Sequence, residues 1–492
     1  MSGDPSLRRL AEAILVPPFP GTTVPDWLRA ALGRGLAGVT LYGRNVAGPG
    51  QVAALTAQLR AAADEPVIAI DEEGGDVTRI AHQTGSPYPG NAALGAVDDT
   101  QLTREIYRQL GADLAGVGIN FDLAPIADVN SAPDNPIIGT RSFGAGTDLV
   151  ARHAAAAITG LQSAGIAACA KHFPGHGSTR DDSHHIMAMV DGGLDELRRR
   201  DLPPFIAAIE AGVRAIMPGH LLVPGLTGGL PATWSAAAVT GLLRGELGFT
   251  GVIITDALEM RAVSDPHGVP EAAVRTLAAG VDLLCLGNDQ DEQSYLAVRD
   301  TLVAAVAEGR LPAGRLEEAG SRVAELRGWL RARGGAAGQA QVNGNGDGQA
   351  GLSVARRALR VFGLSSPLAD PVVVELRTER NIAVGAVPWG LGPWLDGNVV
   401  RLDVGQDGPG QANAIANVLA RAVGRPLVVV VRDAHRHQAA QDVTTELLAA
   451  RPDAVVVEMG LPVWRPASGG YVATYGAAWP NGRAAAEVLG LA

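Results

Sequence analysis

Short apolar runs rich in β-branched residues recur along the first 290 residues, and stretches rich in Ala, Leu and Arg separate them. Apolar runs without polar alternation are typical of parallel strands that helices cover on both faces. Eight runs satisfy this pattern, at residues 12–17, 38–43, 66–75, 119–125, 166–176, 214–220, 251–260 and 281–287. We therefore predict an α/β fold whose first domain is a (β/α)8 TIM-type barrel, with a doubly wound parallel sheet as the alternative.

A segment of low charge divides the chain into two parts. Residues 334–351 are rich in Gly, Gln and Asn, a composition typical of a flexible linker. Three further apolar runs follow, at residues 371–376, 425–433 and 452–460. We predict a barrel domain over residues 1–333, a linker over 334–351, and a smaller α/β domain with an open parallel sheet over 352–492.

The second domain carries polar residues after its strands but no Gly-rich phosphate-binding sequence. These residues are Arg432, Asp433, His435 and Glu458. They do not form a recognisable catalytic set, so the expected role of the second domain is to pack against the barrel.

Composition narrows the possible partners. Hydrophobic residues make up 47% of the 492 residues, which is enough to bury a sizeable core. The chain has 40 basic and 51 acidic side chains and therefore a net charge of −11. No cluster of basic residues in the sequence is large enough to offset this acidic excess. Neither nucleic acid nor a membrane surface is therefore expected as a partner.

The two cysteines and the N-terminal stretch favour a cytoplasmic location. Cys169 and Cys285 each lie inside an apolar run, where a free cysteine behaves as a small buried hydrophobic residue. The N-terminal stretch has arginines ahead of apolar residues, as an export signal has. However, Glu12 interrupts its apolar part and Pro17 with Pro18 ends it too early.

The chain contains 39 arginines and a single lysine, Lys171. This position is expected to need a compact ammonium group rather than a planar guanidinium. Lys171 is also one of several ionisable residues at or after the ends of five predicted strands: Asp71, Arg79, Asp122, Lys171, His172, His220 and Asp256. Because the carboxyl ends of barrel strands meet at one mouth, we expect these residues to form one site.

The segment after the fifth strand, residues 171–185, reads KHFPGHGSTRDDSHH. Its Gly, Ser and Thr residues predict a loop. Asp182 precedes His184 by two residues, a spacing that lets the carboxylate accept from Nδ1–H of the imidazole on a turn. His184 is therefore a candidate general acid and base on this loop.

Three other interpretations of this segment stay open. The histidines could belong to a structural loop, or they could bind zinc, although this segment contains neither an HxH nor an HExxH arrangement. Lys171 could form a Schiff base, which would make the protein a lyase or aldolase on a TIM barrel. We expect no cofactor and no metal.

At this point the residues resemble a known family. KHFPGHGSTRDDSHH is similar to the KH-F-PGHG-x4-DSH signature of the β-N-acetylglucosaminidases of glycoside hydrolase family 3. Four further segments resemble family motifs in the same order: IDEEGGDVTR, NFDLAPIADV, GTRSFG and IITDALEM. The C-terminal region resembles the (α/β) sandwich domain of the family in outline. The chain departs from the pattern at Asp76, where an arginine is frequent.

The resemblance implies a function and a set of site residues. It implies an exo-β-N-acetylglucosaminidase that acts with retention through a glycosyl-aspartate, on muropeptide or chitin fragments. Asp256 would be the nucleophile, and His184, held by Asp182, the acid and base. An imidazolium needs no large pKa shift to be protonated near neutrality. The residues implied to bind the sugar are Asp71, Arg79, Arg141, Lys171 and His172.

Inorganic phosphate is an alternative acceptor to water in the second step. A neutral imidazole does not repel an anion as a carboxylate base would, and Lys171, Arg79 and Arg141 are expected to make the pocket electropositive. The resemblance permits phosphorolysis too, because it has been proposed for members of this subgroup. The reaction would then release a sugar 1-phosphate.

Overall fold

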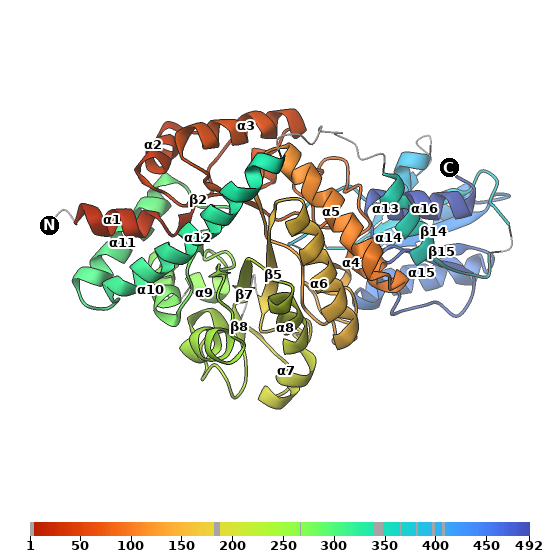
Figure 1. The fold of residues 1–492 in the computed structure, drawn as a ribbon. Helices are drawn as coiled ribbons and strands as arrows, with labels where there is room; N and C mark the ends of the chain where they lie inside the picture. Colours follow the sequence, from red (N-terminus) through yellow and green to blue (C-terminus); the bar gives the residue numbers. More distant parts are fainter. Residues whose placement is uncertain are drawn as a thin grey trace. The chain divides into compact units, whose positions relative to one another are not determined.

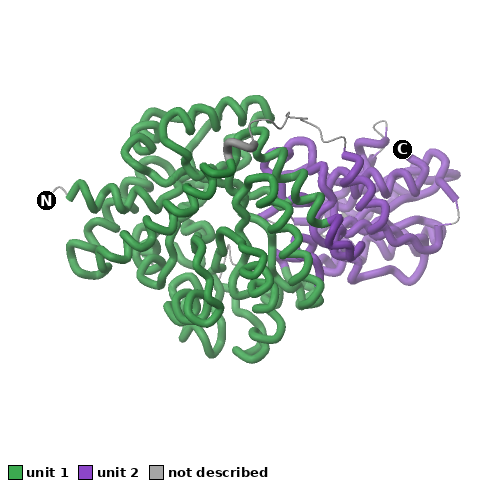
Figure 2. The backbone as a smooth tube through the Cα atoms, in the orientation of Figure 1, with its two compact units in different colours: residues 1–73, 103–135, 145–344 green, residues 74–102, 136–144, 345–492 purple. Residues whose placement is uncertain are grey.

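The computed structural model describes residues 4–181, 187–265, 267–337, 348–364, 366–379, 382–395, 399–405 and 409–492. The chain divides into two compact units, drawn in green and purple in Figure 2. Unit 1 comprises residues 1–73, 103–135 and 145–344, and unit 2 comprises residues 74–102, 136–144 and 345–492.

Unit 1 contains the predicted barrel (Figure 1). Its parallel strands, within the described residues, follow the ring order β1 (Leu15–Val16), β2 (Gly38–Leu41), β3 (Val67–Ile70), β4 (Phe121–Asp122), β5 (Ala167–Phe173), β7 (Ala215–Pro218), β9 (Val252–Ile253) and β10 (Leu284–Cys285). Strands β2, β3, β4, β5, β7 and β9 form one sheet, and β1 pairs with β10. A parallel bridge between Ile254 and Leu283, and a hydrogen bond of 3.3 Å from Thr40 N to Pro17 O, join the two sheets into a ring. These strands lie in the eight predicted runs, so the barrel prediction is confirmed.

Helices surround the ring because each strand is buried and needs an apolar cover on its outer face. They are α1 (Pro5–Glu12), α2 (Asp26–Arg34), α3 (Pro49–Ala62), α5 (Thr100–Gly116), α6 (Thr147–Ser163), α7 (Leu194–Arg200), α8 (Leu202–Glu210), α9 (Arg261–Ser264), α10 (Gly268–Ala279), α11 (Glu292–Ala307) and α12 (Ala313–Ala337). Shorter turns are η1 (Gly43–Asn45), η3 (Ala232–Trp234) and the π-helix η4 (Ala237–Glu246). Strands β6 (Ala188–Met189) and β8 (Leu221–Leu222) pair with each other after β5 and β7.

Unit 2 is built on a mainly parallel sheet. Its strand order is β11 (Arg360–Phe362), β16 (Gly470–Ala473), β15 (Val455–Glu458), β14 (Leu427–Val431), β12 (Val372–Arg377) and β13 (Val399–Asp403), with β11 alone antiparallel among these described strands. Its helices are α4 (Asn91–Val97), α13 (Gln349–Ala358), α14 (Pro409–Arg421), α15 (Gln438–Ala450), α16 (Trp479–Leu489), η2 (Gly139–Arg141), η5 (Gly392–Trp394) and η6 (Ala434–Arg436).

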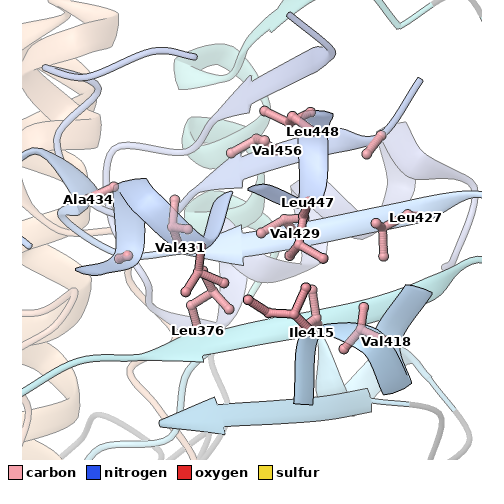
Figure 3. Close-up of a cluster of buried hydrophobic side chains, with 14 of the residues drawn as sticks. Leu376, Ile415, Val418, Leu427, Val429, Val431, Ala434, Leu447, Leu448 and Val456 are labelled. Atoms are coloured by element: carbon pink, nitrogen blue, oxygen red, sulfur yellow. The ribbon is translucent and has the colours of Figure 1, made fainter. Parts of the chain in front are cut away.

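The continuous valine runs of unit 2 suit a sheet that is buried on both faces, because each face then needs apolar side chains. Val429 and Val431 of β14 point into the cluster of Figure 3, where they meet Leu447 of α15. Val428 and Val430 alternate to the opposite face and join a second cluster with residues of α16.

Two segments from the first part of the sequence belong to unit 2. Residues 74–102, which follow β3, and residues 136–144 are purple in Figure 2. Helix α12 extends to Ala337 and α13 begins at Gln349. The predicted domain boundaries at residues 333 and 352 stay a prediction.

In the described part of the chain, no helix is both long enough and apolar enough to cross a bilayer.

Candidate active site

The barrel carries most of the predicted site residues at the carboxyl ends of its strands. They are Asp71 after β3, Asp122 at the end of β4, Lys171 and His172 within β5, His220 after β7, and Asp256 after β9. The parallel arrangement brings these ends to one face of the ring, which is where TIM barrels hold their active sites.

The single lysine pairs with two carboxylates. Lys171 Nζ lies 2.6 Å from Asp71 Oδ1 and 2.8 Å from Glu73 Oε1. The side chains of Lys171 and Glu73 are 3% and 2% exposed, whereas that of Asp71 is 22% exposed. The buried ammonium therefore has close opposite charges, and Asp71 is the member of the triad that a solute can reach.

His172 is oriented by the buried carboxylate of Asp128. Its Nδ1 lies 2.8 Å from Asp128 Oδ2, and the backbone N–H groups of His172 and His176 donate to Asp128 Oδ1 at 3.1 and 2.7 Å. Burial alone would raise the pKa of Asp128, but the two histidines and these hydrogen bonds lower it overall. An ionised Asp128 thus fixes the ring of His172 and the backbone that begins the following loop.

The candidate nucleophile accepts a hydrogen bond from the next residue, whose backbone a buried histidine holds. Asp256 Oδ1 accepts from Ala257 N at 2.8 Å, and Asp256 is partly exposed. His220 Nε2 lies 3.1 Å from Ala257 O, while its Nδ1 lies 2.8 Å from Thr233 Oγ1. Because a carbonyl only accepts, Nε2 of the fully buried His220 donates to it. His220 therefore positions the peptide next to Asp256.

Several of these groups interact electrostatically with one buried thiol, that of Cys169. Burial raises the pKa of Cys169, and the charges of Lys171, Asp71 and Asp256 also act on it. Asp122 differs from the other carboxyls because burial raises its pKa well above the usual range. Its Oδ2 has no hydrogen-bond partner among the described residues, which suits a protonated carboxyl. Asp122 is therefore a poor nucleophile.

The loop after β5 requires glycine at its start. Gly175 has φ +135°, and a Cβ there would lie 2.6 Å from Cβ of Asp201. Asp201 is fully buried and is bound by Arg200, with Nη2 to Oδ2 at 2.9 Å. Burial raises the pKa of Asp201 to about 6.

Asp182 and His184, further along this loop, lie outside the described residues.

The two predicted arginines lie in unit 2. Arg79 donates to Ala383 O at 3.0 Å, and Arg141 Nη1 donates to Ile137 O at 3.1 Å. Their proposed role toward the sugar stays a prediction.

Sequence reasoning missed Glu73 and Asp128 as parts of the site. Both stand inside segments that carry the family resemblance, IDEEGGDVTR and NFDLAPIADV. The signal was present, but their role depends on which basic side chain each carboxylate meets in the folded chain.

The comparisons with known sequences agree with the motifs. The sequence profile of the glycosyl hydrolase family 3 N-terminal domain matches residues 25–326. β-Hexosaminidase A of Pseudoalteromonas piscicida is 34% identical over 332 residues, which are 62% of this chain but only 56% of that protein. β-Hexosaminidase LpqI of Mycobacterium tuberculosis is 38% identical over 266 residues, 53% of this chain and 68% of that protein.

A solved structure extends the similarity to nearly the whole chain. The glycoside hydrolase family 3 β-N-acetylglucosaminidase from Paenibacillus sp. FPU-7 superposes with a TM-score of 0.87 at 32% identity. The superposition covers 98% of this chain and 96% of that one. The chain therefore belongs to glycosyl hydrolase family 3, as its motifs predict.

Proposed function

We propose that this protein is a retaining exo-β-N-acetylglucosaminidase that removes terminal β-linked N-acetylglucosamine. The names of its relatives support the reaction class. One observation carries the assignment of the nucleophile. Asp256 is partly exposed and fixed by its backbone, whereas Asp71 is tied to Lys171 and Asp122 is buried with a raised pKa.

The reaction has two steps in this proposal. First, a carboxylate oxygen of Asp256 forms a bond to the anomeric carbon as the glycosidic bond breaks, and His184 gives its proton to the leaving oxygen. Second, His184 takes a proton from water, the water oxygen bonds to the anomeric carbon, and the ester to Asp256 breaks. Two inversions give overall retention. The role of His184 rests on the resemblance.

The ion triad of Lys171, Asp71 and Glu73 suits recognition of sugar hydroxyls. Asp71 is the accessible member and can accept from a hydroxyl, while its bond to Lys171 fixes its orientation. Asp128 likewise orients the imidazole of His172. Such charge-assisted hydrogen bonds cost little reorganisation when the sugar binds because both partners are already held.

We propose muropeptides or chitin fragments as substrate classes, since both can end in β-linked N-acetylglucosamine. We also propose the cytoplasm as the compartment, which the two free, buried cysteines favour because they need no oxidising environment.

The lyase alternative is disfavoured by the surroundings of Lys171. A Schiff base forms from a neutral amine, and two carboxylates within 2.8 Å favour the charged ammonium instead. Borohydride treatment with a carbonyl substrate should leave Lys171 unmodified.

The experiment compares aryl β-N-acetylglucosaminide, β-glucoside and β-xyloside as substrates of the wild-type enzyme and of Asp256→Asn. We expect the acetamido sugar to be preferred and the variant to lose activity by at least about 10³-fold. A mechanism-based fluorosugar should label the peptide that contains Asp256. Labelling of Asp122 or Glu72 would contradict the assignment, and preference for β-glucoside would contradict the substrate class.

A further inference from the structure

Asp76 joins three separate segments of unit 2. Its Oδ2 accepts from Thr140 Oγ1 at 2.7 Å and lies 3.1 Å from a guanidinium nitrogen of Arg432. Its Oδ1 accepts from Ala477 N at 2.9 Å. The side chain is only 4% exposed, so these three donors replace most of the water that an ionised carboxylate requires.

Arg432 stands at a special point of the sheet. It directly follows β14, which neighbours β12, and β13 lies on the other side of β12. The chain order thus reverses between β12 and β14. In open α/β sheets a crevice at such a switch point, at the carboxyl ends of the strands, usually binds a ligand. Here the arginine at the switch point pairs with Asp76, from the segment that follows barrel strand β3.

The segment that carries Asp76, residues 74–102, makes further contacts with residues 136–144 and with the C-terminal part of the chain. Asn91 Nδ2 donates to the backbone oxygen of Arg141 at 2.7 Å. A Cβ at Gly476, next to Ala477, would lie 2.9 Å from Pro89 O, so the backbones approach closely here. Residues 74–102 and 136–144 therefore pack with the C-terminal part of the chain as one body.

These segments carry Arg79 and Arg141. Asp76 precedes Arg79 by three residues, and Thr140 is the neighbour of Arg141. We propose that Asp76 and Arg432 are positioning residues through which the C-terminal domain fixes the two substrate-binding arginines. The inference rests on the proposed function, because it takes Arg79 and Arg141 to bind the sugar. It assigns the C-terminal domain a direct part in substrate affinity.

The test measures kinetics on an aryl β-N-acetylglucosaminide together with amide hydrogen exchange in residues 74–102 and 136–144. The variants are Asp76→Asn, Arg432→Gln, the double variant and Arg432→Lys. Arg401→Gln is the matched control, because it removes a similar pair in unit 2, Arg401 Nε to Glu375 Oε2 at 3.1 Å.

We expect Asp76→Asn and Arg432→Gln each to raise KM by about tenfold or more, with kcat changed by less than about threefold. Both should accelerate exchange in the two segments. The double variant should be no worse than the worse single variant, because both remove one interaction. Arg432→Lys should recover part of the affinity, and Arg401→Gln should change neither KM nor exchange in these segments.

Two outcomes would overturn the inference: KM values for Arg432→Gln equal to those of Arg401→Gln, or unchanged exchange in both segments. A wild-type enzyme inactive on every aryl glycoside would instead refute the proposed function. The exchange comparison would still decide whether Asp76 and Arg432 hold the segments.

Discussion

Lys171 Nζ lies 2.6 Å from Asp71 Oδ1, which places the only lysine of the sequence in an ion pair between barrel strands β5 and β3. Glu73 adds a second carboxylate at 2.8 Å. The arrangement explains why lysine persists in a chain that otherwise uses arginine. A compact ammonium can satisfy two carboxylates in a space where its own side chain is 3% exposed, and a planar guanidinium needs a wider site.

Lys171→Arg should therefore lower kcat/KM for an aryl β-N-acetylglucosaminide by about 100-fold or more, since a misplacement of about 1 Å can cost that much. The larger guanidinium would displace Asp71, the accessible member of the triad. Arg331→Lys, an exchange at a half-exposed position, is the control and should leave activity unchanged. Wild-type kinetics in Lys171→Arg would refute the need for a compact cation.

Asp128→Asn tests the orientation of His172. The amide keeps the size of the side chain but cannot offer an ionised acceptor to Nδ1 and to two backbone N–H groups. We expect kcat/KM to fall by about 10- to 100-fold, the loss that is typical when a group that orients a metal-binding histidine is removed. Steady-state kinetics and thermal unfolding should be measured together. A loss of Tm with intact kcat/KM would assign Asp128 a purely structural role.

The strands and the strand-end residues could be predicted from the sequence because their signals are local. A buried parallel strand reads as a continuous apolar run, and the polar residue that ends the run marks the mouth of the barrel. Asp71, Lys171 and Asp256 were identified in this way, and the structure places each at a strand end.

The partners of these residues could not be predicted in the same way. Glu73 has no local sequence feature that distinguishes it from Glu72. Its ion pair with Lys171 is visible only in the folded chain. The pairing of Asp76 with Arg432 joins segments that are far apart in the sequence, so neither residue carries a sign of the other. For the same reason, the membership of residues 74–102 in unit 2 could not be predicted from the sequence.

Asp201 should make stability depend on pH. Burial raises the pKa of this carboxyl to about 6 from a model-peptide value of 3.8, so the folded state binds its proton more tightly. Its contribution to stability is complete below about pH 4 and is lost as the pH rises through about 6. The loss is on the order of 3 kcal/mol, because one pKa unit corresponds to about 1.4 kcal/mol.

Urea unfolding of the wild type and of Asp201→Asn at several pH values between about 4 and 7 measures this contribution. The free energy of unfolding of the variant relative to the wild type should rise with pH across this range, because asparagine binds no proton. A difference that stays constant with pH would show that Asp201 titrates alike in the folded and unfolded states.

The ion triad also bears on whether water or phosphate resolves the glycosyl-enzyme. The sequence suggested an electropositive pocket that would attract phosphate, but the charge of Lys171 is offset by two carboxylates, Asp71 and Glu73. The triad has a net negative charge, so it repels a phosphate anion but not neutral water, and only Arg79 and Arg141 would attract the anion. We therefore expect hydrolysis.

With a good leaving group, so that breakdown of the Asp256 ester limits turnover, added phosphate should not change the rate relative to sulfate at equal ionic strength. The product should be free N-acetylglucosamine. A rate that increases with phosphate, with N-acetylglucosamine 1-phosphate as the main product, would instead identify a phosphorylase.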